Sequence, residues 1–199
     1  PYLMGLFDKF LSDSHNYLPM IQTNRGCPFS CTFCQEGMRY FTKVNKHSLE
    51  FVVKELDYIA ERVDPSVGLW ITDSNWAMYR EDVEIAKHIA KIQSRIQWPK
   101  GVISSTGKAN LKRIIQVGKI LNGAMFISNS VQSMNTDVLN AIKRKNLKKS
   151  ELEENKEDLA EMRQEPEIII PLPNETKETF RAGLNQLLDI GTPQRFAVF

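Results

Sequence analysis

The sequence predicts an α/β fold in which parallel strands alternate with helices. Short apolar runs are followed by segments whose apolar residues recur at helical spacing, and this order repeats from residue 18 to residue 199. Strands separated by helices pair in parallel through right-handed crossovers. A doubly wound sheet and a partial barrel both fit this order. A complete eightfold barrel needs about 250 residues, more than the 199 present.

Six strands are expected. Each is a run of four to six residues rich in Val, Ile, Leu or aromatic side chains. The expected strands cover residues 18–23, 67–72, 102–106, 124–128, 167–172 and 196–199.

Helices are expected between the strands, and the clearest covers residues 48–63. Its Val52, Leu56 and Ile59 recur at helical spacing, and Asp64-Pro65 ends the element. Segment 151–163 is so polar that its charges most simply form a solvated face. The remaining helices are expected at residues 80–96, 111–121, 135–144 and 176–190.

One domain is expected in this chain. Residues 1–17 read as a lead-in or linker rather than as a core element, and residues 18–199 form the expected core domain. The last expected strand has no helix after it, which is unusual for a natural domain. We therefore expect these residues to be a fragment of a larger protein.

The composition is that of an ordinary globular protein, with 42% hydrophobic and 25% charged residues. A net charge of +2 favours neither nucleic acid nor a membrane surface as a partner. No apolar run approaches the ~20 residues that span a bilayer, and residues 1–10 lack the apolar segment of a signal peptide. An odd number of clustered cysteines fits a reducing compartment, so we expect a cytoplasmic protein.

All three cysteines of the chain, Cys27, Cys31 and Cys34, lie within eight residues. Their C-x3-C-x2-C spacing falls on the loop after the first expected strand, and ligands of parallel sheets bind at that end of the strands. Gly26 allows a tight turn before the first thiol. Three thiolates can hold a metal centre and leave one coordination position open for a substrate or cofactor.

Iron–sulfur clusters and zinc both accept thiolate ligands. A structural zinc site needs four ligands, and His47 is the residue that would complete a zinc knuckle with the three cysteines. Buried structural thiols without a metal are a weaker alternative, because packing alone hardly explains three cysteines in eight residues.

The cysteine loop resembles the signature of the radical S-adenosylmethionine (SAM) superfamily, including the aromatic residue before the third cysteine. The residues that carry the resemblance are Cys27-Pro28-Phe29-Ser30-Cys31-Thr32-Phe33-Cys34. The order of elements is similar to that superfamily's TIM-like partial (β/α)6 barrel, so the resemblance implies this fold over nearly the whole chain.

The resemblance implies that the three cysteines bind a [4Fe-4S] cluster whose remaining iron is chelated by SAM. One electron then cleaves SAM reductively to methionine and a 5′-deoxyadenosyl radical, which abstracts hydrogen from a substrate. It further implies an electron donor such as flavodoxin or ferredoxin. The substrate, expected to be a small molecule, is not identified by the sequence.

The resemblance also suggests residues for SAM itself. Phe33 matches an aromatic residue that packs near the adenine, with ordinary core packing as the alternative. In the family a Gly-Gly-Glu element after the second strand receives the methionine amine. Asp73 and Asn75 stand at that place in this chain, with a polar turn as the alternative.

Two further segments are similar to SAM-binding elements. Ser128 and Gln132 belong to a run similar to the family's Val-Gln-Ser element, whose polar side chains approach ribose and methionine. Ile169 and Leu172 lie in a segment similar to Gly-Leu-Pro-Gly-Glu-Thr, where apolar residues flank the adenine. The two glycines of the family segment are replaced in this chain by Pro171 and Asn174.

Arg144 resembles the arginine that often ends the helix after the fourth strand of the family. It lies in a run of basic residues, so a solvated helix end is the favoured interpretation of this side chain.

Residues 1–7 and 73–82 look like the corresponding segments of cobalamin-dependent radical SAM proteins. This implies an N-terminal cobalamin-binding domain outside the chain, and a full protein that transfers a methyl group through cobalamin or uses it otherwise. Two alternatives stay open. One is a non-catalytic domain with a structural zinc or iron–sulfur site. The other is an RNA-modifying radical SAM enzyme, which the small net charge disfavours.

Overall fold

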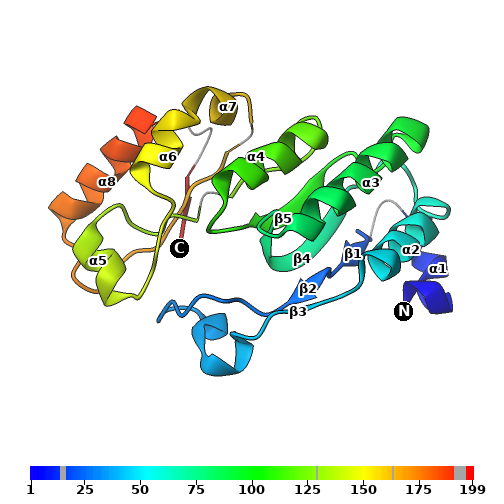
Figure 1. The fold of residues 1–199 in the computed structure, drawn as a ribbon, viewed down its shortest axis with the longest axis horizontal. Helices are drawn as coiled ribbons and strands as arrows, with labels where there is room; N and C mark the ends of the chain where they lie inside the picture. Colours follow the sequence, from blue (N-terminus) through cyan, green and yellow to red (C-terminus); the bar gives the residue numbers. More distant parts are fainter. Residues whose placement is uncertain (14–16, 129, 163, 191–195) are drawn as a thin grey trace.

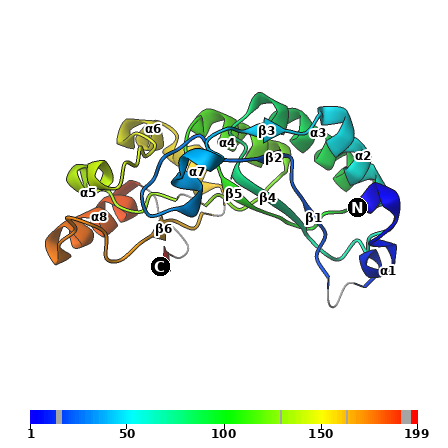
Figure 2. The same cartoon turned by 90° about the horizontal axis from the view of Figure 1, so that it is seen from below.

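The computed structural model describes residues 1–13, 17–128, 130–162, 164–190 and 196–199. Strands and helices alternate along the chain and follow an open arc (Figures 1 and 2). The expected α/β class with parallel strands is confirmed.

The central sheet has the order β1 (Met20–Ile21), β4 (Leu69–Trp76), β5 (Val102–Thr106), with both neighbouring pairs parallel. Single parallel bridges continue the series from Val102 to Met125, from Ile127 to Gln164 and from Gln132 to Ile168. The series ends with β6 (Glu167–Ile168) paired in parallel to β7 (Ala197–Val198). Within the described residues the strands thus form a partial barrel that remains open.

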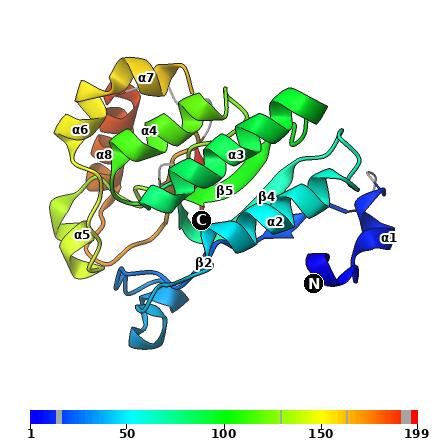
Figure 3. The same cartoon turned by 45° about the vertical axis from the view of Figure 1, so that its right-hand side comes forward.

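Helices cover one face of this sheet. α2 (Leu49–Ala60), α3 (Arg80–Ile96) and α4 (Leu111–Ile120) lie side by side on it (Figures 1 and 3). Further along the arc lie α5 (Thr136–Ala141), α6 (Lys149–Glu154), α7 (Lys156–Ala160) and α8 (Lys177–Ile190). The main core fills the space between the helices and the strands. Its most deeply buried members include Leu56, Ile59, Leu69, Ile71, Ile89, Val102, Ile114 and Val117.

The remaining short elements are α1 (Asp8–Leu11), an antiparallel pair of β2 (Asn24–Arg25) with β3 (Asn45–Lys46), and three 3₁₀ helices. The 3₁₀ helices are η1 (Tyr2–Met4), η2 (Gln35–Gly37) and η3 (Arg39–Phe41). Among the described residues, no helix combines the length and apolar character needed to cross a membrane.

Several expected elements have different bounds. The second strand continues to Trp76, so residues 73–75 belong to β4 and not to a turn. The expected strand at 124–128 is reduced to the bridges of Met125 and Ile127. The fifth strand stops at Ile168, and Pro171 lacks the N–H that a continuing ladder needs.

The polar segment 151–163 is two helices instead of one. Asn155, with φ −111° and ψ 20°, separates α6 from α7. Its side-chain amide donates to the Glu151 carbonyl at 2.7 Å, which satisfies a backbone group at the end of α6.

The first residues of the chain pack on the core, so the expectation of a lead-in without core residues is wrong. Tyr2 and Leu11 are only 6% and 5% exposed and belong to the main core cluster. The Tyr2 hydroxyl donates to the Met20 carbonyl and accepts from the Met20 N–H, both at 2.9 Å. Residues 1–11 therefore hold the edge strand β1.

Leu11→Ala is expected to lower the free energy of unfolding by about 2–5 kcal/mol, because it leaves a cavity in the main core. Leu3→Ala is the matched control, since Leu3 is 42% exposed, and its effect is expected within about 0.5 kcal/mol. Urea unfolding followed by circular dichroism measures both. Equally small effects would contradict the packing of this segment on the core.

Candidate functional site

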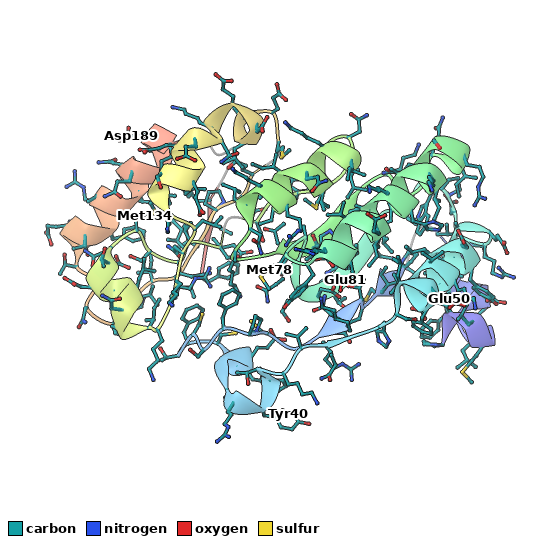
Figure 4. The ribbon with its side chains drawn as sticks, viewed as in Figure 1. Tyr40, Glu50, Met78, Glu81, Met134 and Asp189 are labelled. Carbon is teal, nitrogen blue, oxygen red and sulfur yellow. The ribbon has the colours of Figure 1, made fainter. Side chains whose placement is uncertain are left out.

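The cysteine loop leaves β2 through a turn that requires glycine. Gly26 has φ +108°, and a Cβ atom there would lie 2.5 Å from the Lys43 carbonyl oxygen. The Cys27 N–H donates to the Phe41 carbonyl at 2.9 Å, so the chain returns beside its own start before entering β3. The 3₁₀ helices η2 and η3 form the outer part of this loop, and Tyr40 projects from it away from the molecule (Figure 4).

The three thiols differ in exposure: Cys27 and Cys31 are 3% and 4% exposed, and Cys34 is half-buried. The Cys34 N–H donates to the Cys31 carbonyl at 3.2 Å, and the Gly37 N–H donates to the Cys34 carbonyl at 3.0 Å. A Cβ atom on Gly37 would lie 2.1 Å from the Cys31 carbonyl oxygen, so this position also needs glycine. The backbone from Cys31 to Gly37 is therefore fixed by its own hydrogen bonds.

Asn75 on β4 faces the first cysteine. Its side-chain Nδ2 donates to the Cys27 Sγ at 3.2 Å, and the residue is fully buried. Within the part of the chain that the structure describes, its Oδ1 has no hydrogen-bond partner. The contact places a buried amide donor of β4 against the first thiol of the loop.

Arg144 faces the second cysteine, which corrects the interpretation of this residue as a solvated helix end. It is 6% exposed, and its guanidinium Nη1 lies 3.9 Å from the Cys31 Sγ. The Thr32 N–H also donates to the Ile142 carbonyl at 3.0 Å. The segment after α5 thus contacts the cysteine loop through both backbone and side chain.

Asp73 anchors the start of the cysteine loop. Its Oδ1 accepts from the Thr23 N–H at 2.7 Å and its Oδ2 accepts from the Asn24 side-chain amide at 2.6 Å. The Thr23 hydroxyl and the Asn24 N–H donate to the same carboxylate. Burial raises the pKa of Asp73, against the lowering effect of these hydrogen bonds. Both oxygens have protein donors, so contact between Asp73 and a cofactor stays a prediction.

Asp82 in the first turn of α3 is a second buried carboxyl, 1% exposed. Its Oδ2 accepts from the Tyr79 N–H at 2.8 Å. Burial raises the pKa of Asp82 from 3.8 to about 7, and the charge of Asp73 adds to this effect. The N-terminal end of α3 therefore carries a carboxyl that titrates near neutral pH.

Gln132 and Ser128 lie where the fourth segment of the barrel ends. Gln132 is 5% exposed with φ +64°, and no described residue forms a hydrogen bond with its Oε1. The Ser128 carbonyl accepts from the Thr106 hydroxyl at 2.6 Å, which ties this segment to β5. Of the two, Gln132 has the buried acceptor that is free to bind another group.

The apolar residues expected around the adenine differ in their environments. Phe33 is 39% exposed, so the alternative of ordinary core packing does not hold for it. Leu172 is buried with Val138 and Ile142 in a second hydrophobic cluster, and Ile169 packs against that cluster. These contacts fix Ile169 and Leu172 beside α5, and their contact with a cofactor stays a prediction.

His47 is the residue expected to complete a zinc knuckle with the three cysteines. The His47 ring packs on Phe51 of α2, with ring centroids 5.0 Å apart. In the described parts of the chain, no three His, Cys, Asp or Glu side chains converge to hold a single metal ion.

A hollow of about 440 Å³ lies beside the cysteine loop. Phe29 of the loop lines one side, and Met78, Tyr79 and Arg113 line others. Met78 lies near the N-terminal end of α3, between that helix and the loop (Figure 4). The hollow adjoins the cysteine loop at Phe29, and none of the three cysteines lines it.

Sequence reasoning did not identify Asn146, which joins several of these elements. Its Nδ2 donates to the carbonyls of Val131 and Ser133, and its Oδ1 accepts from Arg144 Nε. A lone Asn after a basic run carries no periodic signal, so only the tertiary structure reveals this role.

Stability should fall as the pH rises from about 4 to about 7, because folded Asp82 keeps a proton that the unfolded chain has lost. Asp82→Asn is expected to remove this part of the fall, so the variant gains stability relative to the wild type across that window. Urea unfolding at pH 4.5 and 7.5 measures the difference. Glu84→Gln, on the exposed face of the same helix, is the control, and an equal pH dependence for wild type and Asp82→Asn would refute the assignment.

Comparison with known sequences identifies related proteins. The family model of the radical SAM superfamily matches residues 21–187. The cobalamin-dependent radical SAM methyltransferase TokK of Streptomyces tokunonensis is 30% identical over 100% of this chain and 30% of its own length. The 2-(S-pantetheinyl)-carbapenam-3-carboxylate methyltransferase of Streptantibioticus cattleyicolor is 28% identical with the same coverage. The chain thus spans about 30% of the length of these relatives.

The fold is also similar to a solved structure, the radical SAM methyltransferase TsrM from Kitasatospora setae with tryptophan substrate and a SAM analog bound. The TM-score is 0.75 at 15% identity, over 91% of this chain and 35% of that protein. At this identity the likeness concerns the fold alone, and it confirms the partial barrel. The family match over residues 21–187 establishes that the chain belongs to the radical SAM superfamily.

Proposed function

We propose that the chain is the core of a radical SAM enzyme that binds a [4Fe-4S] cluster through Cys27, Cys31 and Cys34. One observation carries the proposal: buried nitrogen donors face two of the three thiols of the loop, Asn75 toward Cys27 and Arg144 toward Cys31. Neither donor would be needed to stabilise uncharged structural thiols.

The residues fit the proposed cluster chemically. Thiolates are the protein ligands that iron–sulfur clusters use, and three of them leave one iron without a protein ligand. The Asn75 amide and the Arg144 guanidinium offset the negative charge that the thiolates and the cluster bring into a buried site.

Two buried acceptors support SAM as the second cofactor. Asn75 Oδ1 and Gln132 Oε1 have no partner among the described residues, although the two residues are 0% and 5% exposed. Unpaired buried acceptors are costly, so a ligand that donates to them binds favourably. The ammonium and ribose hydroxyl groups of SAM supply such donors.

The other expected SAM residues take complementary roles in this proposal. Phe33 offers an exposed ring to the adenine, and Ile169 with Leu172 offers an apolar wall. Ser128 adds a hydroxyl near the ribose, and Asp73 holds the loop that carries the thiols. When bound, the cofactors supply one-electron cleavage of SAM to methionine and the 5′-deoxyadenosyl radical.

We extend the proposal to methyl transfer in the full protein. The relatives matched over this whole chain are named as methyltransferases, and TokK as cobalamin-dependent. The proposed partners are an N-terminal cobalamin-binding domain, a small-molecule substrate, and an electron donor such as flavodoxin or ferredoxin.

Replacing Cys27, Cys31 or Cys34 singly by Ala is expected to abolish the cluster, because each supplies one ligand. Iron and sulfide analysis after anaerobic reconstitution measures the loss, with Ser30→Ala in the same loop as control. In the wild type, the electron paramagnetic resonance (EPR) signal of the reduced cluster should change when SAM is added. A wild-type EPR signal that does not change when SAM is added would overturn the proposal. So would a Cys variant that keeps four irons.

Asn75→Asp is expected to shift the midpoint potential of the cluster to a more negative value. The variant replaces the N–H that faces Cys27 by a carboxylate oxygen, so the more negative reduced cluster loses a stabilising donor. A redox titration without SAM measures the shift. Asn45→Asp, which adds the same charge at an exposed position of β3, should leave the potential nearly unchanged, and equal potentials for both variants would contradict the role of Asn75.

A further inference from the structure

Asn146, in the segment between α5 and α6, holds the turn that carries Gln132. Its Nδ2 donates to the Val131 carbonyl and to the Ser133 carbonyl, both at 2.8 Å. One side-chain amide therefore forms hydrogen bonds with the residues on both sides of Gln132. Such a double contact fixes the direction in which the intervening side chain leaves the backbone.

Gln132 has a backbone conformation that needs this support. Its φ of +64° lies in the left-handed region, which costs a non-glycine residue about 1 kcal/mol or more. Its N–H donates to the Glu167 carbonyl at 2.9 Å, and its carbonyl accepts from the Ile169 N–H at 3.4 Å. The backbone is thus held by residues 167–169 on one side and by Asn146 on the other, while the buried Oε1 has no partner among the described residues.

The same Asn146 contacts the residue that faces the cysteine loop. Its Oδ1 accepts from Arg144 Nε at 3.1 Å, and another nitrogen of that guanidinium lies 3.9 Å from Cys31 Sγ. Both polar atoms of the Asn146 side chain are therefore hydrogen-bonded. Oδ1 binds Arg144, which faces the cysteine loop, and Nδ2 binds the turn that carries Gln132.

We propose that Asn146 is a positioning residue for SAM binding, acting through Gln132 without touching SAM, and that it also aligns Arg144 on Cys31. This inference rests on the proposed function, because it takes Gln132 as a SAM contact. It predicts that removing the amide donors of Asn146 weakens SAM binding while the cluster itself is retained.

Asn146→Asp in the reconstituted full-length protein is the test. The aspartate keeps an oxygen for Arg144 and loses both N–H donors to the carbonyls around Gln132. The expected result is wild-type iron and sulfide content with SAM affinity about tenfold weaker, from an EPR titration. Asn155→Asp is the matched control, because Asn155 also donates its amide to a backbone carbonyl but belongs to the boundary of α6 and α7. Its SAM affinity should equal that of the wild type.

A double-mutant cycle shows whether Asn146 acts through Gln132. If it does, adding Asn146→Asp to Gln132→Ala causes no further loss of SAM affinity. Full additivity, or wild-type SAM affinity in Asn146→Asp, would overturn the inference. If Asn146→Asp does not fold, Asn146→Ser carries the same test, because it keeps one donor and should bind SAM more weakly than the wild type.

The failure of this inference differs from the failure of the proposed function. A wild-type cluster that does not respond to SAM refutes the proposed function. A wild type that responds, with an equal response in the Asn146 variants, refutes only the positioning role.

Discussion

The structure of the site depends on one buried carboxylate. Asp73 on β4 accepts hydrogen bonds from the backbone and side chains of Thr23 and Asn24, and so joins the centre of the sheet to the segment that leaves β1. The cysteine loop begins two residues later, at the glycine turn of Gly26. Burying a carboxylate is costly unless its oxygens are paired, and here that pairing fixes where the thiols lie relative to the strand ends.

With the loop anchored, groups from distant parts of the chain meet the thiols. Asn75, two residues beyond the anchoring carboxylate, donates to Cys27, and Arg144 approaches Cys31 from the segment after α5. Asn146 then links Arg144 to the turn of Gln132. This chain of contacts runs from the first strand to the fourth segment of the barrel. It includes Asn75 and Gln132, whose side-chain oxygens have no hydrogen-bond partner among the residues that the structure describes. In the proposed function, the cluster binds the thiols, and SAM donates hydrogen bonds to these acceptors.

Local patterns in the sequence predicted the parallel α/β class and the long helices. α3 has the expected bounds of residues 80–96, because its amphipathic pattern and its start are both encoded locally. Contacts between distant parts of the chain determine the positions that local patterns did not predict. Asp73 and Asn75 were expected after the end of the second strand, yet they extend β4, and their hydrogen-bond partners lie far away along the chain. Arg144 is buried for a similar reason, since its cysteine partner is 113 residues away, and no local pattern encodes such a pair.

The central claim is that three cysteines hold a four-iron cluster whose remaining iron takes SAM. The most direct measurement is the Mössbauer spectrum of the ⁵⁷Fe-reconstituted protein with and without SAM. The account predicts a four-iron cluster in which SAM changes the isomer shift of one iron and leaves the other three unchanged. Spectra that are identical with and without SAM, or that contain no four-iron cluster, would contradict it.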